Sequence, residues 1–426
     1  MPERFDVVGE RREAEHSQRL AAVRSSADDA EVPSDSLIPD VDPVAPLVAE
    51  ILQTKTVSSQ EVWADLEAWV PSIQDEVVSL TKTLQAVIPI SQEEIEALEA
   101  TGTELEYVPS KLVHTIKSGT GLKRSRVVAC GNFVSKDAKA TQEVNSASHT
   151  SPTLKREHLY ASGLDCWSLR IHLRFASLKG WVNGSTDIRK AFLRAPLDTQ
   201  QTSGKVIIMR APKVLYWTGL AAWEEKWRVL KAMYGLQESP RAWSDHRDSE
   251  VPKLRIQLEG QMYRLVQTEA DPSVWLLKLA SEQGPEVGDQ EIRGILSIYV
   301  DDLLISSQPA LVKAVYEALT ALWECSKLEF ANPREPMKFC GLQIEGHPGF
   351  TALHQANYEQ ELLTKYAHVT GQQTAPCPTN LGVESGVEES ADSPDLDKVR
   401  AAQALAGELL WLAQRSRLEL AFPVNK

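Results

Sequence analysis

From residue 58 to residue 87, aliphatic side chains recur at alternating spacings of four and three. They are Leu66, Val70, Ile73, Val77, Leu80 and Leu84. This period places them on one face of a helix, so the segment is expected to pack against a core. Because proline fits the first turn of a helix, we expect a second helix to begin at Pro71. The acidic run over residues 93–104 predicts a solvated helix face.

A second helical pattern occupies residues 151–180. Its expected buried face comprises Leu164, Trp167, Ile171, Phe175 and Leu178. The following residues, 181–188, read as a β-strand that carries Asp187 near its end. A carboxylate at the end of a strand is most often a cap or turn residue, so this position alone predicts no chemistry.

Two short aliphatic runs flank a pair of aspartates between residues 295 and 306. Aspartate is depleted in strands and favoured in tight turns, so the pattern predicts a β-hairpin with Asp301 and Asp302 at its tip. Buried arms would hold both carboxylates on a rigid edge, where they could bind divalent metal. From this stretch alone, a simple turn that carries two acids is an equally good interpretation.

Residues 110–136 carry six bases and no acid. They are Lys111, Lys117, Lys123, Arg124, Arg126 and Lys136. Strand-like residues alternate around a glycine-rich turn at 118–121, which predicts a basic hairpin. Such a hairpin is a candidate phosphate-binding surface, and a solvated charged hairpin is the alternative.

The composition limits the functions that the chain can have. Residues 1–57 are acidic and rich in Pro, Ser and Ala, and we expect them to be mostly disordered. The net charge of the 426 residues is −14, so any binding of nucleic acid must come from a local basic surface. The five cysteines show no C-x-x-C spacing, which suits free thiols in a reducing compartment. We find no apolar run long enough to span a bilayer, and we expect no membrane partner.

Several blocks, taken in order, resemble the reverse transcriptase of copia-type LTR retrotransposons. Residues 123–131 resemble the family's K-A-R-L-V-A-R-G block, and residues 187–197 are similar to D-V-x-x-A-F-L-x-x-x-L. Residues 230–243 resemble Y-G-L-K-Q-S-P-R-A-W, with Gln237 and Glu238 where the family has Lys and Gln. Residues 299–302 resemble the catalytic hairpin, and residues 337–344 resemble the F-L-G-(I/L)-x-I strand. Further similar blocks lie at 270–275, at 354–366 and in a closing helix from Leu405.

The resemblance implies an α+β right-hand polymerase fold with fingers, a palm with an antiparallel sheet and a catalytic β-hairpin, and a partial thumb. The hydrophobic pattern predicts an N-terminal helical segment at 58–106, and the resemblance, which begins near residue 107, implies fingers and palm at 107–346. Residues 347–426 would form a helical region like a thumb or connection, which stops before an RNase H domain.

The resemblance also implies site residues. The catalytic and metal-binding set is Asp187, Asp301 and Asp302, with Ile188 beside the metal; the cofactor is a pair of Mg²⁺ ions, for which Mn²⁺ can substitute. The nucleotide-binding set is Lys123, Arg124, Arg126, Phe192, Tyr234 and Gly235. The template- and primer-binding set is Ser239, Pro240, Arg241, Tyr299, Phe339 and Gly341. Arg126 would contact the triphosphate, and Phe192 would lie beneath the sugar of the incoming nucleotide.

The function implied is RNA-directed DNA synthesis during transposition. Its partners are an RNA template, a DNA or RNA primer and deoxynucleoside triphosphates. The expected location is the cytoplasm, including a virus-like particle, with access to the nucleus. The alternative is a catalytically decayed retroelement fragment that at most binds nucleic acid, which the change at Gln237 and Glu238 favours. Retention of the three aspartates and Arg126 favours the enzyme, and a purely structural acidic protein would leave the ordered blocks unexplained.

Overall fold

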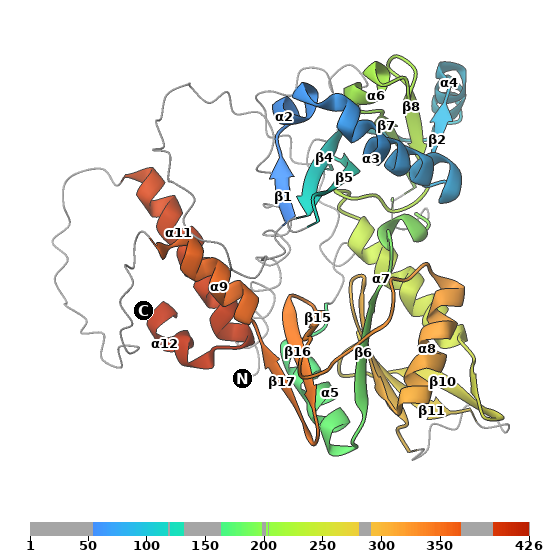
Figure 1. Ribbon diagram of the computed structural model, residues 1–426. Helices are drawn as coiled ribbons and strands as arrows, with labels where there is room; N and C mark the ends of the chain where they lie inside the picture. Colours follow the sequence, from blue (N-terminus) through green and yellow to red (C-terminus); the bar gives the residue numbers. More distant parts are fainter. Residues whose placement is uncertain are drawn as a thin grey trace, which may run out of the picture. The chain divides into compact units, whose positions relative to one another are not determined.

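The computed structural model describes residues 54–117, 120–131, 163–197, 202, 204–280, 291–367 and 395–425 (Figure 1). All but the last four residues of the tail expected to be disordered lie outside these ranges. The chain is a mixed α/β protein with several sheets and two compact units. The first unit comprises Met1–Tyr160 and Phe192–Trp243, and the second comprises Ala161–Ala191 and Ser244–Lys426. The domain boundaries expected from the sequence follow the chain, whereas the two units interleave along it.

The first unit contains two small sheets. One has the order β1-β4-β5, and the other has the order β2-β8-β7-β3. The strands are β1 (Thr54–Val57), β2 (Val87–Ile90), β3 (Leu105–Val108), β4 (Ser110–Lys117), β5 (Leu122–Ala129), β7 (Val206–Arg210) and β8 (Lys226–Val229). Strands β4 and β5 are antiparallel, which confirms the two strands of the basic hairpin; residues 118 and 119 of the predicted turn, and Lys136, lie outside the described ranges.

Helices cover the first unit. They are α2 (Ser59–Ala64), α3 (Leu66–Val78), the π-helix η1 (Ser79–Thr83), α4 (Gln92–Ala100), the 3₁₀ turn η4 (Phe192–Arg194) and α6 (Lys213–Trp217). A capping box between Ser58 and Glu61 starts α2. The predicted helix start at Pro71 is wrong, because the break falls at Asp65 and Pro71 lies inside α3. Pro71 is on the exposed side of α3, while Ile73 is fully buried; this packing outweighs the lost backbone hydrogen bond.

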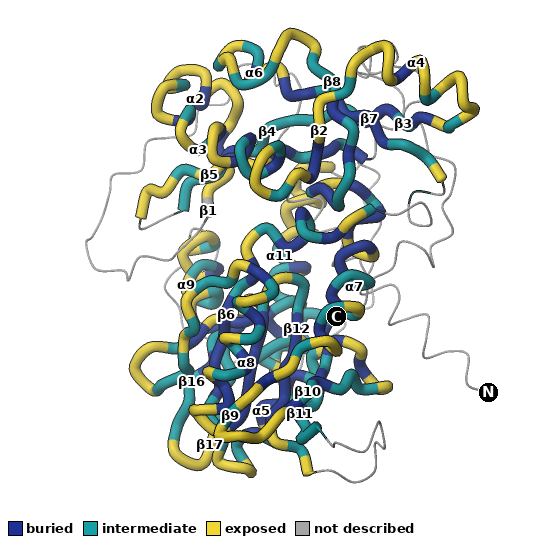
Figure 2. The backbone as a smooth tube through the Cα atoms, turned by 90° about the vertical axis from the view of Figure 1, so that its right-hand side faces the viewer, coloured by how far each residue is buried: buried dark blue, intermediate teal, exposed yellow. Residues whose placement is uncertain are grey.

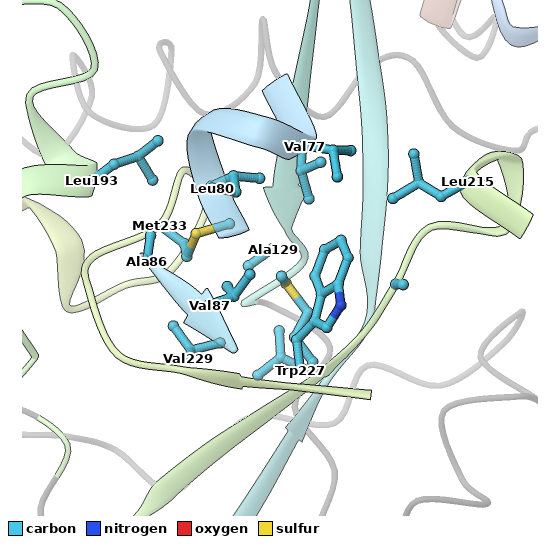
Figure 3. Close-up of a cluster of buried hydrophobic side chains, with 14 of the residues drawn as sticks. Val77, Leu80, Ala86, Val87, Ala129, Leu193, Leu215, Trp227, Val229 and Met233 are labelled. Atoms are coloured by element: carbon cyan, nitrogen blue, oxygen red, sulfur yellow. The ribbon is translucent and has the colours of Figure 1, made fainter. Parts of the chain in front are cut away.

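The core of the first unit joins segments that are far apart in the sequence (Figure 3). Its centre is Trp227, which is fully buried with Met233 and Leu80. The predicted apolar face of residues 66–84 supplies one side of this core, since Ile73, Val77 and Leu80 are all buried. The core therefore depends on strands β5, β7 and β8 meeting helix α3.

The second unit is built on a seven-stranded antiparallel sheet with the order β14-β6-β13-β12-β11-β10-β9. The strands are β6 (Val182–Asp187), β9 (Ile256–Leu258), β10 (Gln261–Gln267), β11 (Val274–Leu279), β12 (Gly294–Tyr299), β13 (Asp302–Ser307) and β14 (Glu329–Phe330). Figure 2 shows the central strands β6 and β12 mainly in the buried colour.

Helices α5 (Cys166–Leu178) and α8 (Pro309–Leu322) cover opposite faces of this sheet (Figure 1). Strand alternation separates the two faces. Asn183 faces α5 through Ser306, whereas a Cβ atom at Gly184 would lie 2.9 Å from Val312 of α8. A side chain at Gly184 would therefore push α8 away from the sheet.

A fourth sheet, which has three strands, packs near α5. It consists of β15 (Met337–Phe339), β16 (Leu342–His347) and β17 (Phe350–His354). The remaining helices are α7 (Ser239–Glu250), η5 (Val251–Lys253), α9 (Ala356–Lys365), α11 (Leu396–Arg415), η6 (Leu418–Leu420) and α12 (Ala421–Asn425). Within the described ranges, every helix is too short or too polar to cross a bilayer.

The buried face predicted for the helix at 151–180 is wrong at three of its five positions, although Leu164 is buried as predicted. Helix α5 begins at Cys166, with Asp165 as its N-cap, and residues before 163 lie outside the described ranges. Its buried residues are Leu169, His172, Leu173 and Ala176. Trp167, Ile171 and Leu178 are instead 65, 67 and 68% exposed. The helix is rotated toward a face that includes a histidine because hydroxyl groups of the sheet bind that side chain.

Candidate active site

Three strands of the second unit bring the acidic side chains together. Asp302 begins β13, where it pairs with Tyr299 of β12 on one side and Asp187 of β6 on the other. Carboxylate oxygens of Asp187, Asp301 and Asp302 all lie within 4.8 Å of one another. Residues far apart in the sequence thus form one acidic cluster, as the resemblance implied; we call it the acidic triad.

The hairpin tip differs from the prediction. It consists of Val300 and Asp301, whereas Asp302 is already the first residue of a strand. Val300 has a φ of 56°, which is unusual for a β-branched residue and stores strain of about 1–3 kcal/mol. The main-chain N–H of Ile188 donates to the carbonyl of Asp301 at 2.8 Å, and this bond fixes the tip against β6.

Ser326 holds the main chain of Asp187 from the other side. Its hydroxyl accepts from the N–H of Asp187 at 2.9 Å, and its own N–H donates to the Asp187 carbonyl at 2.8 Å. This role of Ser326 was not predicted, because a serine 139 residues away from Asp187 carries no local signal. Both the N–H and the carbonyl of Asp187 are therefore held by Ser326.

The surroundings of Asp302 disfavour its ionised form. Burial, followed by the negative charge of Asp301 and a smaller contribution from Asp187, raises its pKa to about 7. One hydrogen bond opposes this shift: the N–H of Cys340 donates to Asp302 Oδ2 at 3.1 Å. Carboxylates that repel one another in this way form a donor set that a hard divalent cation would stabilise.

The N–H of Cys340 comes from a second tight turn. Cys340 and Gly341 join β15 to β16, and both have positive φ, at 51° and 73°. Burial raises the pKa of the Cys340 thiol to about 12, so the thiol is not a nucleophile near neutral pH. The four described cysteines are free.

Three residues at or beside this turn were predicted to bind template or primer. Phe339 is only 1% exposed and packs in the core formed with α5, so its side chain is not accessible to a ligand in this structure. Gly341 is exposed, and Tyr299 is half-buried against Gly163, where a Cβ atom would lie 3.3 Å from its ring. Burial raises the pKa of Tyr299.

The basic residues of β5 lie on two different faces. Lys123 Nζ is 2.9 Å from Asp65 and 5.1 Å from the ring centre of Trp69, so it points toward helix α3. Arg124 and Arg126 alternate with it and are exposed on the other face. The structure therefore separates Lys123 from the two arginines with which the sequence grouped it.

Arg126 belongs to a cluster with two aromatic rings. Its guanidinium carbon is 5.5 Å from the ring centre of Tyr234, and Phe192 meets the same ring edge-on at 5.9 Å. Gly235 follows with a φ of 89°, and a Cβ atom there would lie 2.0 Å from the carbonyl oxygen of Ala129. Arg126, Phe192, Tyr234 and Gly235, all predicted to bind nucleotide, are thus neighbours in the first unit; we call them the cation–aromatic cluster.

Sequence comparisons point to one kind of protein. The chain is 24% identical over 204 residues to a putative transposon Ty5-1 protein of Saccharomyces cerevisiae, covering 47% of this chain and 56% of that protein. It is 26% identical over 285 residues to the retrovirus-related Pol polyprotein from transposon RE2 of Arabidopsis thaliana, covering 65% of this chain and 16% of that protein. The chain is thus similar in sequence to transposon proteins, one of them a Pol polyprotein. This confirms the resemblance inferred from the motifs.

The chain spans only part of each relative, 56% of the first and 16% of the second. No protein-family model matches it. Among solved structures, a foamy viral protease-reverse transcriptase in complex with double-stranded DNA aligns with 80% of this chain and 40% of its own. The sequence identity is 12% and the TM-score 0.37, a likeness too weak to carry an argument.

The structure shows where the side chains of Gln237 and Glu238 lie, the two residues that differ from the motif of the resembled family. Glu238 is buried, and burial raises its pKa, with Glu106 adding to the shift and Lys205 opposing it. The Gln237 side chain donates to the carbonyl of Gly131 at 3.4 Å. The negative charge introduced at residue 238 is therefore enclosed in the first unit and is not presented at the surface.

Helix α7 begins at Ser239. The buried hydroxyl of Ser239 donates to the carbonyl of Met233 at 2.6 Å and so closes the preceding loop. Pro240 and Arg241 are exposed in the first turn of the helix. Of the predicted template- and primer-binding residues, these two, Gly341 and the half-buried Tyr299 remain accessible.

Proposed function

We propose that the chain is an RNA-directed DNA polymerase of a copia-type retrotransposon. It would join a deoxynucleotide to the 3′-hydroxyl of a primer, with pyrophosphate as the leaving group. The observation that carries the proposal is the acidic triad on paired strands, within a chain whose homologues are retrotransposon Pol proteins. A right-hand arrangement of fingers, palm and partial thumb is part of the same proposal.

The acidic triad is the proposed metal site. Asp187 and Asp301 would hold two Mg²⁺ ions, or Mn²⁺ in their place, with Asp302 and the main chain of Ile188 beside them. When bound, these ions activate the attacking hydroxyl and neutralise charge that develops on the phosphate. The bonds from Ile188 and Cys340 fix Asp301 and Asp302 before any ligand arrives, so little reorganisation is needed.

The cation–aromatic cluster is the proposed nucleotide surface. The guanidinium of Arg126, with Arg124 on the same face, suits a triphosphate, because its planar fork binds phosphate oxygens in pairs. Phe192 would exclude a 2′-hydroxyl by shape. Lys123 is bonded to Asp65, so its contribution would be to hold β5 against α3.

Pro240, Arg241, Tyr299 and Gly341 are the proposed contacts with RNA template and primer, and Ser239 would support them by closing its loop. The proposed location is the cytoplasm, including a virus-like particle, with access to the nucleus. A decayed fragment that only binds nucleic acid is the competing function.

Primer extension on an RNA template with Mg²⁺ tests the proposal. We expect extension by the wild type, loss of extension in Asp301→Asn, and full extension in Asp397→Asn, which alters an exposed acid in α11. Template–primer binding that persists in a wild type unable to extend the primer would contradict the polymerase and support the decayed fragment.

A further inference from the structure

His172 of helix α5 is bonded to both strands of the hairpin that carries Asp301 and Asp302. It is 1% exposed, with Nδ1 2.7 Å from the hydroxyl of Ser297 in β12 and Nε2 2.7 Å from that of Ser306 in β13. The Ser306 hydroxyl also lies 2.6 Å from Asn183 Oδ1 in β6, the strand that carries Asp187. One side chain thus connects all three strands of the acidic triad.

The directions of these hydrogen bonds follow from the chemistry of the groups. Asn183 Nδ2 donates to the hydroxyl of Thr351, so its Oδ1 faces Ser306 and can only accept. Ser306 must donate its proton to Asn183, and it therefore accepts from Nε2–H of His172. Nδ1 carries no proton and accepts from Ser297. A neutral imidazole satisfies every bond, in keeping with the pKa of about 3 to which burial lowers His172.

The network lies on the same face of the sheet as the acidic triad. Ser306 pairs with Asn183, and four residues along the same two strands Asp302 pairs with Asp187. Four strand residues span about 13 Å, and even-numbered spacings keep side chains on one face. The Ser306–Asn183 pair and the Asp302–Asp187 pair therefore belong to the same β6–β13 strand pairing.

The two pairs experience opposite forces. At the triad, oxygens of three carboxylates lie within 4.8 Å of one another, and the mutual repulsion of like charges at this distance favours separation of β6 from β13. At Ser306, saturated hydrogen bonds between buried groups hold the same two strands together. A one-residue slip would turn every side chain to the other face, so the register of this ladder decides whether the carboxylates meet.

We infer that His172 is a positioning residue for the acidic triad. It acts through Ser306, Ser297 and Asn183 to hold β6, β12 and β13 in register while the carboxylates repel one another. That the triad serves metal binding rests on the proposed function, whereas the positioning of the strands does not.

Two serines on the same strand provide a matched test. Ser306→Ala removes the centre of the network, and Ser307→Ala removes an equally buried hydroxyl that donates to the carbonyl of Arg293 instead. In the metal-free full chain, we expect Ser306→Ala to speed amide hydrogen exchange about tenfold in residues 182–188 and 298–306 and not in 256–267. Ser307→Ala should leave exchange at the triad end unchanged. Equal exchange there in both variants, or a uniform increase through the second unit, would overturn the inference.

Metal affinity adds a second readout. We expect Ser306→Ala and His172→Leu to weaken Mn²⁺ binding about tenfold, as measured by calorimetry. His114→Leu is the control, because His114 is also buried but belongs to the first unit. Wild-type affinity in both triad-side variants would show that His172 is only a core residue. A wild type that binds no Mn²⁺ would contradict the proposed function, and the exchange measurement would still decide the positioning role.

Discussion

The hairpin β4–β5 in the first unit and the hairpin β12–β13 in the second both carry charged side chains, but they hold them in opposite ways. In β5, Arg124 and Arg126 lie exposed on one face, where water solvates them. In β12–β13, Asp302 is partly buried beside two other acids, and its pKa is raised to about 7. The first arrangement places charge where it costs little, and the second places charge where it opposes folding.

Substitutions in the two hairpins should therefore affect ligand binding and folding stability differently. Removing an exposed arginine should weaken binding of an anionic ligand with little effect on folding. Removing a carboxylate from the acidic triad should weaken metal binding and make the metal-free protein more stable, because repulsion is relieved. Four measurements test whether the two hairpins differ in this way.

The largest effect is expected from Asp302→Asn. The amide oxygen can still accept from Cys340, so the fold is retained, but the negative charge is lost. We expect polymerase activity to fall about a thousandfold or more. At pH 8 without metal, the free energy of unfolding should rise by on the order of 1–3 kcal/mol. A variant that unfolds more easily than the wild type at pH 8 would contradict the view that the charge of Asp302 opposes folding.

The next effect concerns Phe192, which contacts Tyr234 edge-on and is half-buried. Phe192→Val should lower the discrimination against ribonucleotides about a hundredfold while much of the deoxynucleotide activity remains. The measurement is kcat/KM for each nucleotide with the same template. Phe175→Val, which shortens another half-buried ring, is the control. Loss of folding together with both activities would show that Phe192 is a core residue.

A smaller effect is expected within β5. Arg126→Ala should raise the KM for deoxynucleotides about tenfold, with an unchanged melting temperature. Lys123→Ala should do the reverse, lowering stability slightly and leaving KM unchanged, because Lys123 faces Asp65 and Trp69. Equal KM effects from the two substitutions would mean that the strand does not divide its cations between two faces.

The smallest effect is a dependence of stability on pH in the absence of metal. Asp302 has a raised folded pKa, so its favourable contribution is complete below pH 4 and is lost as the pH rises to about 7. His114 and His172 act in the opposite sense: burial lowers their pKa values to about 4 and about 3, so stability is lost as the pH falls below 6.5. The difference between wild type and Asp302→Asn isolates the carboxylate.

Urea unfolding with EDTA from pH 4 to pH 8 measures that difference. We expect the wild type to lose stability relative to Asp302→Asn as the pH rises. Parallel curves would indicate that the carboxylate titrates normally and that the repulsion in the triad is small. Addition of Mn²⁺ should reverse the loss in the wild type alone, because the cation binds the ionised carboxylates.

The sequence predicted what depends on neighbours in the chain. Alternation and turn residues were enough for the hairpins β4–β5 and β12–β13, and ordered motifs identified Asp187 as a partner of Asp301. The position of the tip was missed by one residue, since local preference for turns cannot tell Asp302 in a strand from Asp302 in a turn. Strand pairing with Asp187 decides that point.

The sequence-based predictions were wrong where groups distant in the chain determine the local structure. Helix α5 offers two apolar stripes, and counting apolar residues selected the one containing Trp167 and Ile171. The structure buries the other because Ser297 and Ser306 bond to His172, which no helical period reveals. The predicted helix start at Pro71 was wrong for a similar reason. Packing of the core around Ile73 keeps α3 continuous through a proline that would otherwise interrupt the helix.

The interleaving of the two units has a consequence for synthesis on the ribosome. Ala129 at the end of β5 donates to the carbonyl of Tyr234, and β6 pairs with β13, so each contact waits for about a hundred further residues. At typical elongation rates that delay is on the order of ten seconds, during which the apolar side of β5 lacks Trp227 and Met233. Synonymous codons that slow translation between residues 130 and 243 should therefore increase aggregation of the nascent chain, although the finished protein would be identical.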